Sequence, residues 1–147
     1  MASSDNESRR HSDSPYGKVP ITITRSRAGK TVKLVVAGEL DSTSAAMLDR
    51  FIRREELAEP TLIRVDLQHT SFMDAAGVRS LVAAARRAGA GSWRLRVVNA
   101  RGMVRKVCDI TQLDAMIDHW QSSGDRHRAG ERRRRDSMTR HAAAFPG

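Results

Sequence analysis

One stretch of the sequence decides the fold: Ile63-Arg-Val-Asp-Leu-Gln-His-Thr-Ser-Phe-Met-Asp-Ala-Ala-Gly-Val-Arg-Ser-Leu-Val82. From Ile63 to Leu67 apolar and polar side chains alternate, which predicts a strand with one buried face. From Val78 onwards apolar side chains recur at helical spacing. A short loop between the two patterns ends at Asp74, whose carboxylate can accept the unpaired N–H groups of a first helical turn. The stretch therefore predicts a strand, a loop and a helix.

Strand and helix patterns alternate along the rest of the chain as well. Alternation over Val19–Val36 predicts a β-hairpin whose four- or five-residue loop contains Ser26–Gly29. Strands and helices that alternate after a hairpin favour an α/β fold, with helices packed on a mixed, mainly parallel sheet. The further elements we expect are a helix over Ser42–Leu57 capped by Asp41, a strand over Trp93–Val97, a short helix around Met103–Val107 and a last strand or edge segment at Met116–Trp120.

The length of 147 residues suits one domain with tails at both ends. We expect a disordered N-terminal tail over residues 1–18, a folded domain over 19–120 and a basic, disordered C-terminal tail over 121–147. No apolar run reaches the length that crosses a bilayer, and the first residues lack the apolar stretch of a secretory signal. These features predict a cytoplasmic protein with no membrane partner.

The formal net charge is +9, and the C-terminal tail is basic out of proportion to its length because it contains the run Arg132–Arg135. Such a run is typical of a solvated extension. Binding of nucleic acid through this tail is the alternative, but no aromatic residues are interleaved with the arginines for base stacking. We therefore do not expect nucleic acid as a partner.

Three titratable residues in the decisive stretch raise the question of catalysis. Asp66, His69 and Asp74 lie close enough in sequence to place an imidazole beside a carboxylate as an acid/base pair. The spacing does not require such a pair, and the chain contains no HExxH, P-loop, CxxC or Gly-x-Ser-x-Gly motif. We expect no enzyme, no catalytic residue, no bound metal and no cofactor.

Two motifs carry a resemblance to a known family. Phe72-Met-Asp-Ala-Ala-Gly77, with Gly38-Glu-Leu-Asp41 upstream, closely resembles the STAS domain of bacterial anti-sigma factor antagonists. The resemblance covers Val19–Trp120 and implies a single STAS-like α/β domain. The family usually has Phe-Met-Asp-Ser-Ser/Thr-Gly-Leu in this loop. Ala75 therefore stands where the family's phosphorylated serine would be, and Ala76 replaces its hydroxyl-bearing neighbour.

The resemblance also implies a function. The family's loop and helix dock on an anti-sigma factor, a serine kinase of the histidine-kinase-like ATPase class, and release its sigma factor, which regulates transcription under stress. Because Ala75 cannot accept a phosphate, we expect no phosphorylation at the usual site, although Thr70, Ser71 and Ser80 leave a displaced site open. A ligand-sensing STAS module is the other alternative. The residues expected to bind the partner are Glu39, Asp41, Ser42, Thr43, Asp74, Ala75, Ala76, Gly77 and Arg79.

Cys108 offers a separate route to regulation. Arg105 and Lys106 lie close to it in sequence, and cationic neighbours that face a thiol lower its pKa and make it redox-reactive. The alternative is a small buried hydrophobe, because cysteine is among the most buried residue types. As the one cysteine of the chain, it cannot form an internal disulfide.

Overall fold

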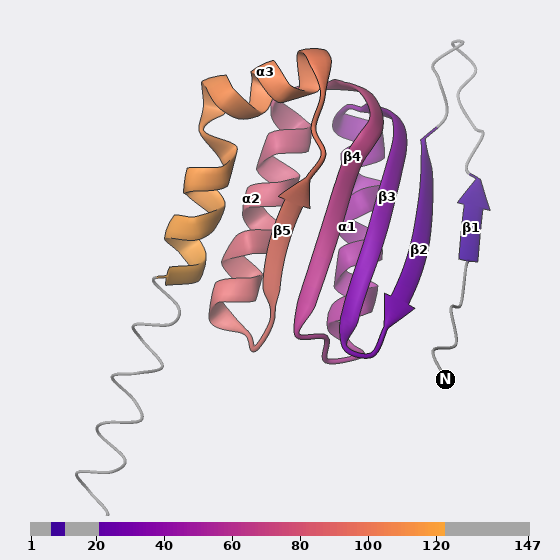
Figure 1. The fold of residues 1–147 in the computed structure, drawn as a ribbon, viewed down its shortest axis with the longest axis vertical. Helices are drawn as coiled ribbons and strands as arrows, with labels where there is room; N and C mark the ends of the chain where they lie inside the picture. Colours follow the sequence, from indigo (N-terminus) through magenta and orange to yellow (C-terminus); the bar gives the residue numbers. More distant parts are fainter. Residues whose placement is uncertain (1–6, 11–20, 123–147) are drawn as a thin grey trace, which may run out of the picture.

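The structure, a computed structural model, describes residues 7–10 and 21–122. Within these ranges, five strands form one sheet in the order β1-β2-β3-β4-β5 (Figure 1). The first three strands pair antiparallel, and β3, β4 and β5 run parallel, which confirms the mixed sheet. The strands are β1 (Glu7–Arg10), β2 (Thr22–Ala28), β3 (Thr31–Leu40), β4 (Leu62–Met73) and β5 (Arg94–Val98).

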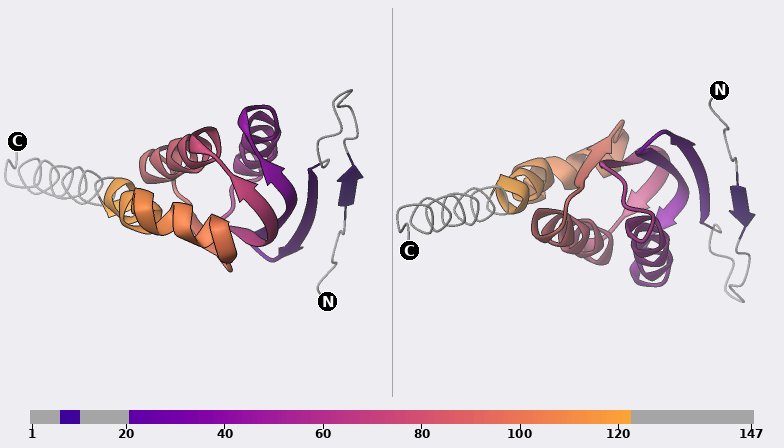
Figure 2. Two further views of the ribbon diagram at one scale, coloured as in Figure 1. Left: turned by 90° about the horizontal axis from the view of Figure 1, so that it is seen from above. Right: turned by 90° about the horizontal axis from the view of Figure 1, so that it is seen from below.

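Two helices, α1 (Ser42–Glu56) and α2 (Ala75–Ala90), lie side by side on one face of the sheet (Figures 1 and 2). The third, α3 (Gly102–Thr111), crosses the end at which the parallel strands finish (Figure 1). Gln112 then adopts a left-handed conformation with φ 52°, and residues 113–122 are helical again. The α/β class with helices packed on a sheet is confirmed.

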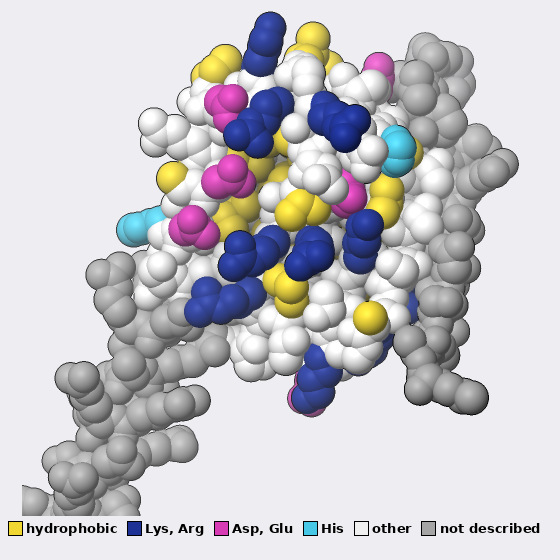
Figure 3. All heavy atoms as spheres, in the orientation of Figure 1, with side chains coloured by type: hydrophobic (Ala, Val, Ile, Leu, Met, Phe, Trp, Pro, Cys, Tyr) yellow, Lys and Arg dark blue, Asp and Glu magenta, His cyan; other side chains and the backbone are white. Residues whose placement is uncertain are grey.

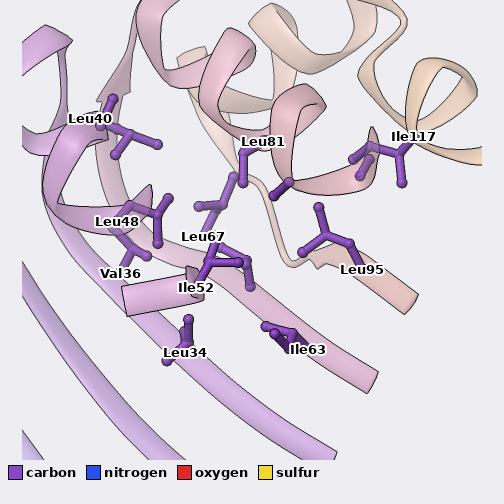
Figure 4. Packing of buried hydrophobic residues seen from close by; sticks show 14 of the residues in the cluster. Leu34, Val36, Leu40, Leu48, Ile52, Ile63, Leu67, Leu81, Leu95 and Ile117 are labelled. Atoms are coloured by element: carbon purple, nitrogen blue, oxygen red, sulfur yellow. The ribbon is translucent and has the colours of Figure 1, made fainter. Parts of the chain in front are cut away.

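The core lies between the sheet and the pair α1 and α2 (Figure 4). Each fully buried large apolar side chain stabilises the fold by roughly 1.5 to 3 kcal/mol. The alternating strand patterns and the helical spacing from Val78 onwards place five apolar side chains on inward faces, and all five are buried, namely Leu34, Val36, Val65, Val78 and Leu81. Val82 and Val97 are half-buried and pack against the same cluster.

The turn between β2 and β3 is tighter than the sequence predicts. The two strands pair as far as Ala28 and Thr31, so the loop consists of Gly29 and Lys30. Gly29 has φ 61°, and a two-residue hairpin loop with glycine at its first position is the composition of a type II′ turn. The longer predicted loop is wrong because the polar end of β2 shows no hydrophobic alternation, although its backbone pairs in full.

Strand β4 is longer than predicted and includes the residues assigned to a loop before Asp74. Register shifts between Val35 and Ala37 and between Gly38 and Glu39 interrupt its pairing with β3. Such irregularities break the alternation of side chains between the two faces. Along β4, three consecutive residues at 65–67 are buried and the next two, at 68–69, are exposed. The period-two signal therefore stops at Leu67 while the strand continues to Met73.

The predicted strand at Met116–Trp120 is wrong, because residues 113–122 are helical. Leu113, Ile117 and Gln121 are the buried members of this helix, and their spacing of four places them on one helical face. The Gln121 side chain occupies the outer edge of β5: the Leu95 N–H donates to Oε1 at 3.2 Å, and Nε2 donates to the Leu95 carbonyl at 3.0 Å. One side chain thus replaces a neighbouring strand at this position.

The N-terminal strand β1 has no counterpart in the sequence analysis, which predicts disorder over residues 1–18. Glu7–Arg10 pairs antiparallel with β2, with Glu7 opposite Arg25 and Arg10 opposite Thr22. Pairing at a sheet edge uses backbone groups and needs no apolar pattern, so polar residues gave no signal for it. The remainder of both predicted tails, including Arg132–Arg135, lies outside the described residues.

Candidate functional site

Two strand-to-helix turns lie next to each other at one end of the sheet (Figure 1). The last residues of β3 and β4, Leu40 and Met73, are paired in register. The Asp74 N–H donates to the Leu40 carbonyl at 3.3 Å, which joins the two turns directly. Since α1 and α2 begin immediately after these turns, two helix N-termini come together on one surface.

The first turn is held by a capping box. The Asp41 Oδ1 accepts hydrogen bonds from the Thr43 and Ser44 N–H groups at 3.0 and 3.1 Å. In return the Asp41 N–H donates to the Ser44 hydroxyl at 2.8 Å, and that hydroxyl donates to the Glu39 carbonyl at 2.6 Å. The predicted cap at Asp41 is confirmed, and Ser44 completes it as a residue that the sequence analysis did not single out.

The second turn is held by Asp74, whose Oδ1 accepts from the Ala76 and Gly77 N–H groups at 2.9 and 3.2 Å. This confirms the predicted cap of α2. Gly77 is needed for close packing, because a Cβ there would lie 2.7 Å from the Met73 Cγ and 3.1 Å from the Leu40 carbonyl oxygen. A larger residue would push α2 away from both strand ends.

The structure places the sequence-predicted partner residues at these adjacent turns and in the first two turns of the helices that follow. The first helical residue of α2, Ala75, is exposed beside its cap. The surface around it therefore combines small side chains with backbone. By exposure the set divides into exposed residues (Ser42, Thr43, Ala75, Arg79), half-buried residues (Glu39, Asp41, Asp74, Ala76) and one buried residue (Gly77).

The three hydroxyls near Ala75 differ in their accessibility. Thr70 is buried and donates to the Val36 carbonyl at 2.8 Å. Ser80 is half-buried and donates to the Ala45 carbonyl at 3.2 Å, which ties α2 to α1. Ser71 is exposed on β4, with its hydroxyl 3.3 Å from the Gly38 carbonyl. Of the three candidates for a displaced modification site, only Ser71 is open to a modifying enzyme.

Asp66, His69 and Asp74 do not form an acid/base pair or triad. In the part of the chain that the structure describes, no hydrogen bond or ion pair joins Asp66, His69 and Asp74 to one another. Asp66 is buried and accepts from the Asn99 side-chain amide at 2.9 Å, whereas His69 is exposed. Residues 7–10 and 21–122 also contain no group of three or more His, Cys, Asp or Glu side chains placed to hold a metal.

Asp66 contributes to stability in a pH-dependent way. Burial raises the pKa of its carboxyl, but hydrogen bonds from the Gln68 N–H and Asn99, together with Lys33 at 3.6 Å, outweigh burial and hold that pKa below its ordinary 3.8. A pKa that is lower in the folded state stabilises the fold above the unfolded value, and this contribution is lost as the pH falls through the folded value.

We therefore expect Asp66→Asn to lower the free energy of unfolding by about 1 kcal/mol at pH 7, because the amide keeps one acceptor but loses the charge. The variant should also lose stability less steeply than the wild type between about pH 5 and pH 2. Urea unfolding across this pH range measures both effects. If the free energy of unfolding fell equally steeply with decreasing pH in both proteins, the role assigned to Asp66 would be contradicted.

Cys108 is buried, with an exposed fraction of 6%. Burial raises the pKa of its thiol, Asp114 adds to the increase, and Arg105 opposes it with a smaller effect. The redox hypothesis depended on a lowered thiol pKa, whereas the pKa of Cys108 is raised. We expect a thiol-reactive disulfide reagent to label Cys108 slowly at neutral pH in the folded protein and rapidly in urea, and rapid labelling of the folded protein would contradict its burial.

The helix α3 adds a feature to this end of the molecule that the sequence analysis did not single out. Met103 and Ile110 are exposed by 57% and 83%, whereas Val104 and Cys108 face the core. The apolar pattern alone indicated the helix but could not show that two of its largest apolar side chains point outwards. Two exposed apolar side chains therefore lie on α3, the helix that crosses the strand ends.

Comparison with known families agrees with this geometry. The family model of the STAS domain matches residues 22–126. The chain belongs to the STAS domain family. This STAS domain is similar to the solved structure of an anti-sigma factor antagonist from Mycobacterium paratuberculosis, with 27% identity and a TM-score of 0.58 over 65% of this chain and 80% of that one.

Two further solved structures are similar to this STAS domain. The anti-sigma factor antagonist SpoIIAA in its unphosphorylated form is 26% identical, with a TM-score of 0.56 over 62% of this chain and 81% of that one. The phosphorylated form of the Bacillus cell fate determinant SpoIIAA is 24% identical, with a TM-score of 0.53 over 64% and 86%. No curated protein matches the chain.

Two of these neighbours are named as anti-sigma factor antagonists. Among the helices in the described ranges, none has the length and apolar character needed to span a bilayer.

Proposed function

We propose that this STAS domain is an anti-sigma factor antagonist that binds a histidine-kinase-like ATPase and thereby frees a sigma factor in the cytoplasm. One observation carries the proposal: Ala75 is exposed at the start of α2, beside the neighbouring α1 turn, in the setting of the family's switch serine. Two neighbours of this domain are named as anti-sigma factor antagonists, which supports the same role.

The contact would use shape more than charge. Both helix N-termini present small residues, and Asp41 and Asp74 already accept the second and third N–H groups of each helix, so a partner that covers these turns leaves fewer donors to be paired. Arg79 is exposed on α2 and is available to pair with an acidic side chain of the partner. Because Gly77 has no side chain, the start of α2 can pack close to Leu40 and Met73, and this packing fixes the position of Ala75 on the surface.

The missing hydroxyl would make the domain permanently competent to bind. A phosphate at position 75 would add up to two negative charges beside the Asp74 carboxylate and inside a closely packed contact, where repulsion and desolvation disrupt binding. Ala75 cannot carry this group. We expect the wild type, incubated with its cognate kinase and ATP, to gain no phosphate in the loop from Thr70 to Ser80, and phosphate found there would overturn this part of the proposal.

The partner can be tested by capture from native lysate with the tagged full-length protein, followed by mass spectrometry. The matched variant replaces Arg132–Arg135 with glutamine, which removes the basic run and leaves the STAS domain intact. We expect both proteins to recover a histidine-kinase-like ATPase. Recovery of mainly RNA-associated proteins by the wild type, lost in the variant and steeply reduced by salt, would instead support nucleic-acid binding through the tail.

A further inference from the structure

The face of the sheet opposite α1 and α2 carries a row of basic side chains. Lys33, Arg64 and Arg96 are directly paired across β3, β4 and β5, so they lie side by side on three adjacent strands. All three are exposed. Figure 3 views this face, with Lys and Arg side chains gathered across the strands. We call this set the basic row, and it lies outside the surface proposed for the anti-sigma factor.

The fold does not account for the basic row. Like charges directly opposite one another in a sheet are destabilising. Lys33 lies 3.6 Å from the Asp66 carboxylate, but within the described residues Arg64 and Arg96 have no side-chain hydrogen bond or ion pair. The row is flanked by half-buried apolar residues, Val35 and Val98 on one side and Leu62 on the other.

An acidic polypeptide fits this surface best. Neighbouring strands are about 4.8 Å apart, so the row spans about 10 Å, a distance that glutamate or aspartate side chains of one short segment can cover. Arginine forks bind carboxylates through two parallel hydrogen bonds, and the flanking valines and Leu62 offer apolar contact to the segment's other side chains. Nucleic acid fits less well, because the paired rows from 31 to 35, 62 to 66 and 94 to 98 contain no aromatic side chain on which a base could stack.

We propose that the basic row, Lys33, Arg64 and Arg96, is a second docking surface that binds an acidic segment of a protein partner. The carboxylates of that segment would separate and neutralise the three cations. The surface is independent of Ala75, so an anti-sigma factor and the acidic segment can bind at the same time.

The test uses the full-length protein and a fluorescein-labelled peptide of about twelve residues in which glutamate alternates with serine, long enough to cross the sheet at about 3.3 Å per residue. Binding is measured by fluorescence anisotropy at physiological salt. The row variant carries Lys33→Gln, Arg64→Gln and Arg96→Gln. The matched variant carries Lys30→Gln, Arg50→Gln and Lys106→Gln, which removes the same charge from exposed positions elsewhere.

We expect the row variant to bind the peptide at least about tenfold more weakly than the wild type, and the matched variant to stay within about twofold. Amide shifts of the wild type on titration should be concentrated in β3, β4 and β5 around the basic row. Equal losses in both variants, or no binding to the wild type, would overturn the proposal. Tighter binding of a labelled oligothymidine than of the peptide, lost in the row variant, would also overturn it and assign the row to nucleic acid.

Discussion

Ala75→Glu is expected to weaken the binding of the anti-sigma factor by about a hundredfold or more, the largest effect on binding that we predict. A carboxylate at this position would lie beside Asp74 and would lose its hydration when the partner closes over the start of α2. Stability should change little, because position 75 is exposed and an anion suits a helix N-terminus. Titration calorimetry with the purified partner measures the loss.

The matched control is Ala90→Glu, which places the same charge at an exposed position at the other end of α2, about 22 Å away at 1.5 Å per residue. It should bind within about twofold of the wild type, since a remote surface charge contributes little. Ala75→Ser should bind like the wild type until the partner's kinase activity phosphorylates it, and should then dissociate. Unchanged affinity of the Ala75→Glu variant would remove this surface from the proposed contact.

Gly89→Ala is expected to lower the free energy of unfolding by about 2 kcal/mol, a large effect for a substitution that adds only one methyl group. Alanine has the better helix propensity by about 1 kcal/mol, so propensity alone predicts a gain. The added Cβ, however, would overlap the Trp120 carbonyl oxygen and lie 3.1 Å from its carbonyl carbon, and overpacking against backbone costs up to about 3 kcal/mol. The helix at 113–122 would have to move away from α2.

Urea unfolding gives the stability of this variant, and Trp120 fluorescence, isolated by a Trp93→Phe substitution in every protein compared, reports the movement. Trp120 is half-buried and lies under the Arg86 guanidinium, whose carbon is 4.0 Å from the ring centroid, so displacement of the helix should change its emission. Ala90→Gly is the comparison, since it lowers helix propensity in the same turn at an exposed position and should leave the emission unchanged. A Gly89→Ala protein as stable as the wild type would disprove the close approach.

Local signals were sufficient to predict the helix starts and most of the core. The capping carboxylates Asp41 and Asp74 each precede an apolar pattern at helical spacing, and both cap the helices that follow. Alternating residues such as Val65 and Leu34 face the core as expected. At these positions one physical cause acts within a few residues of sequence, and tertiary contacts reinforce it.

The sequence predictions were wrong or incomplete where contacts between residues far apart in the chain determine the structure. The extent of β4 depends on register shifts against β3, which no pattern within β4 reveals. The helix at 113–122 is fixed by the buried amide of Gln121 on Leu95, and a glutamine at a core position gives no hydrophobic signal. The basic row needed the pairing of β3, β4 and β5, since its members come from three separate parts of the chain.

The Gln121 contact also limits how this sheet can associate with others. An edge strand with free N–H and C=O groups is a template onto which another chain can add a strand, which leads to oligomers or fibres. At Leu95 both groups are already bound to one amide side chain. A strand that added to β5 would first have to displace the helix that carries Gln121, so self-association through this edge is coupled to partial unfolding of the domain.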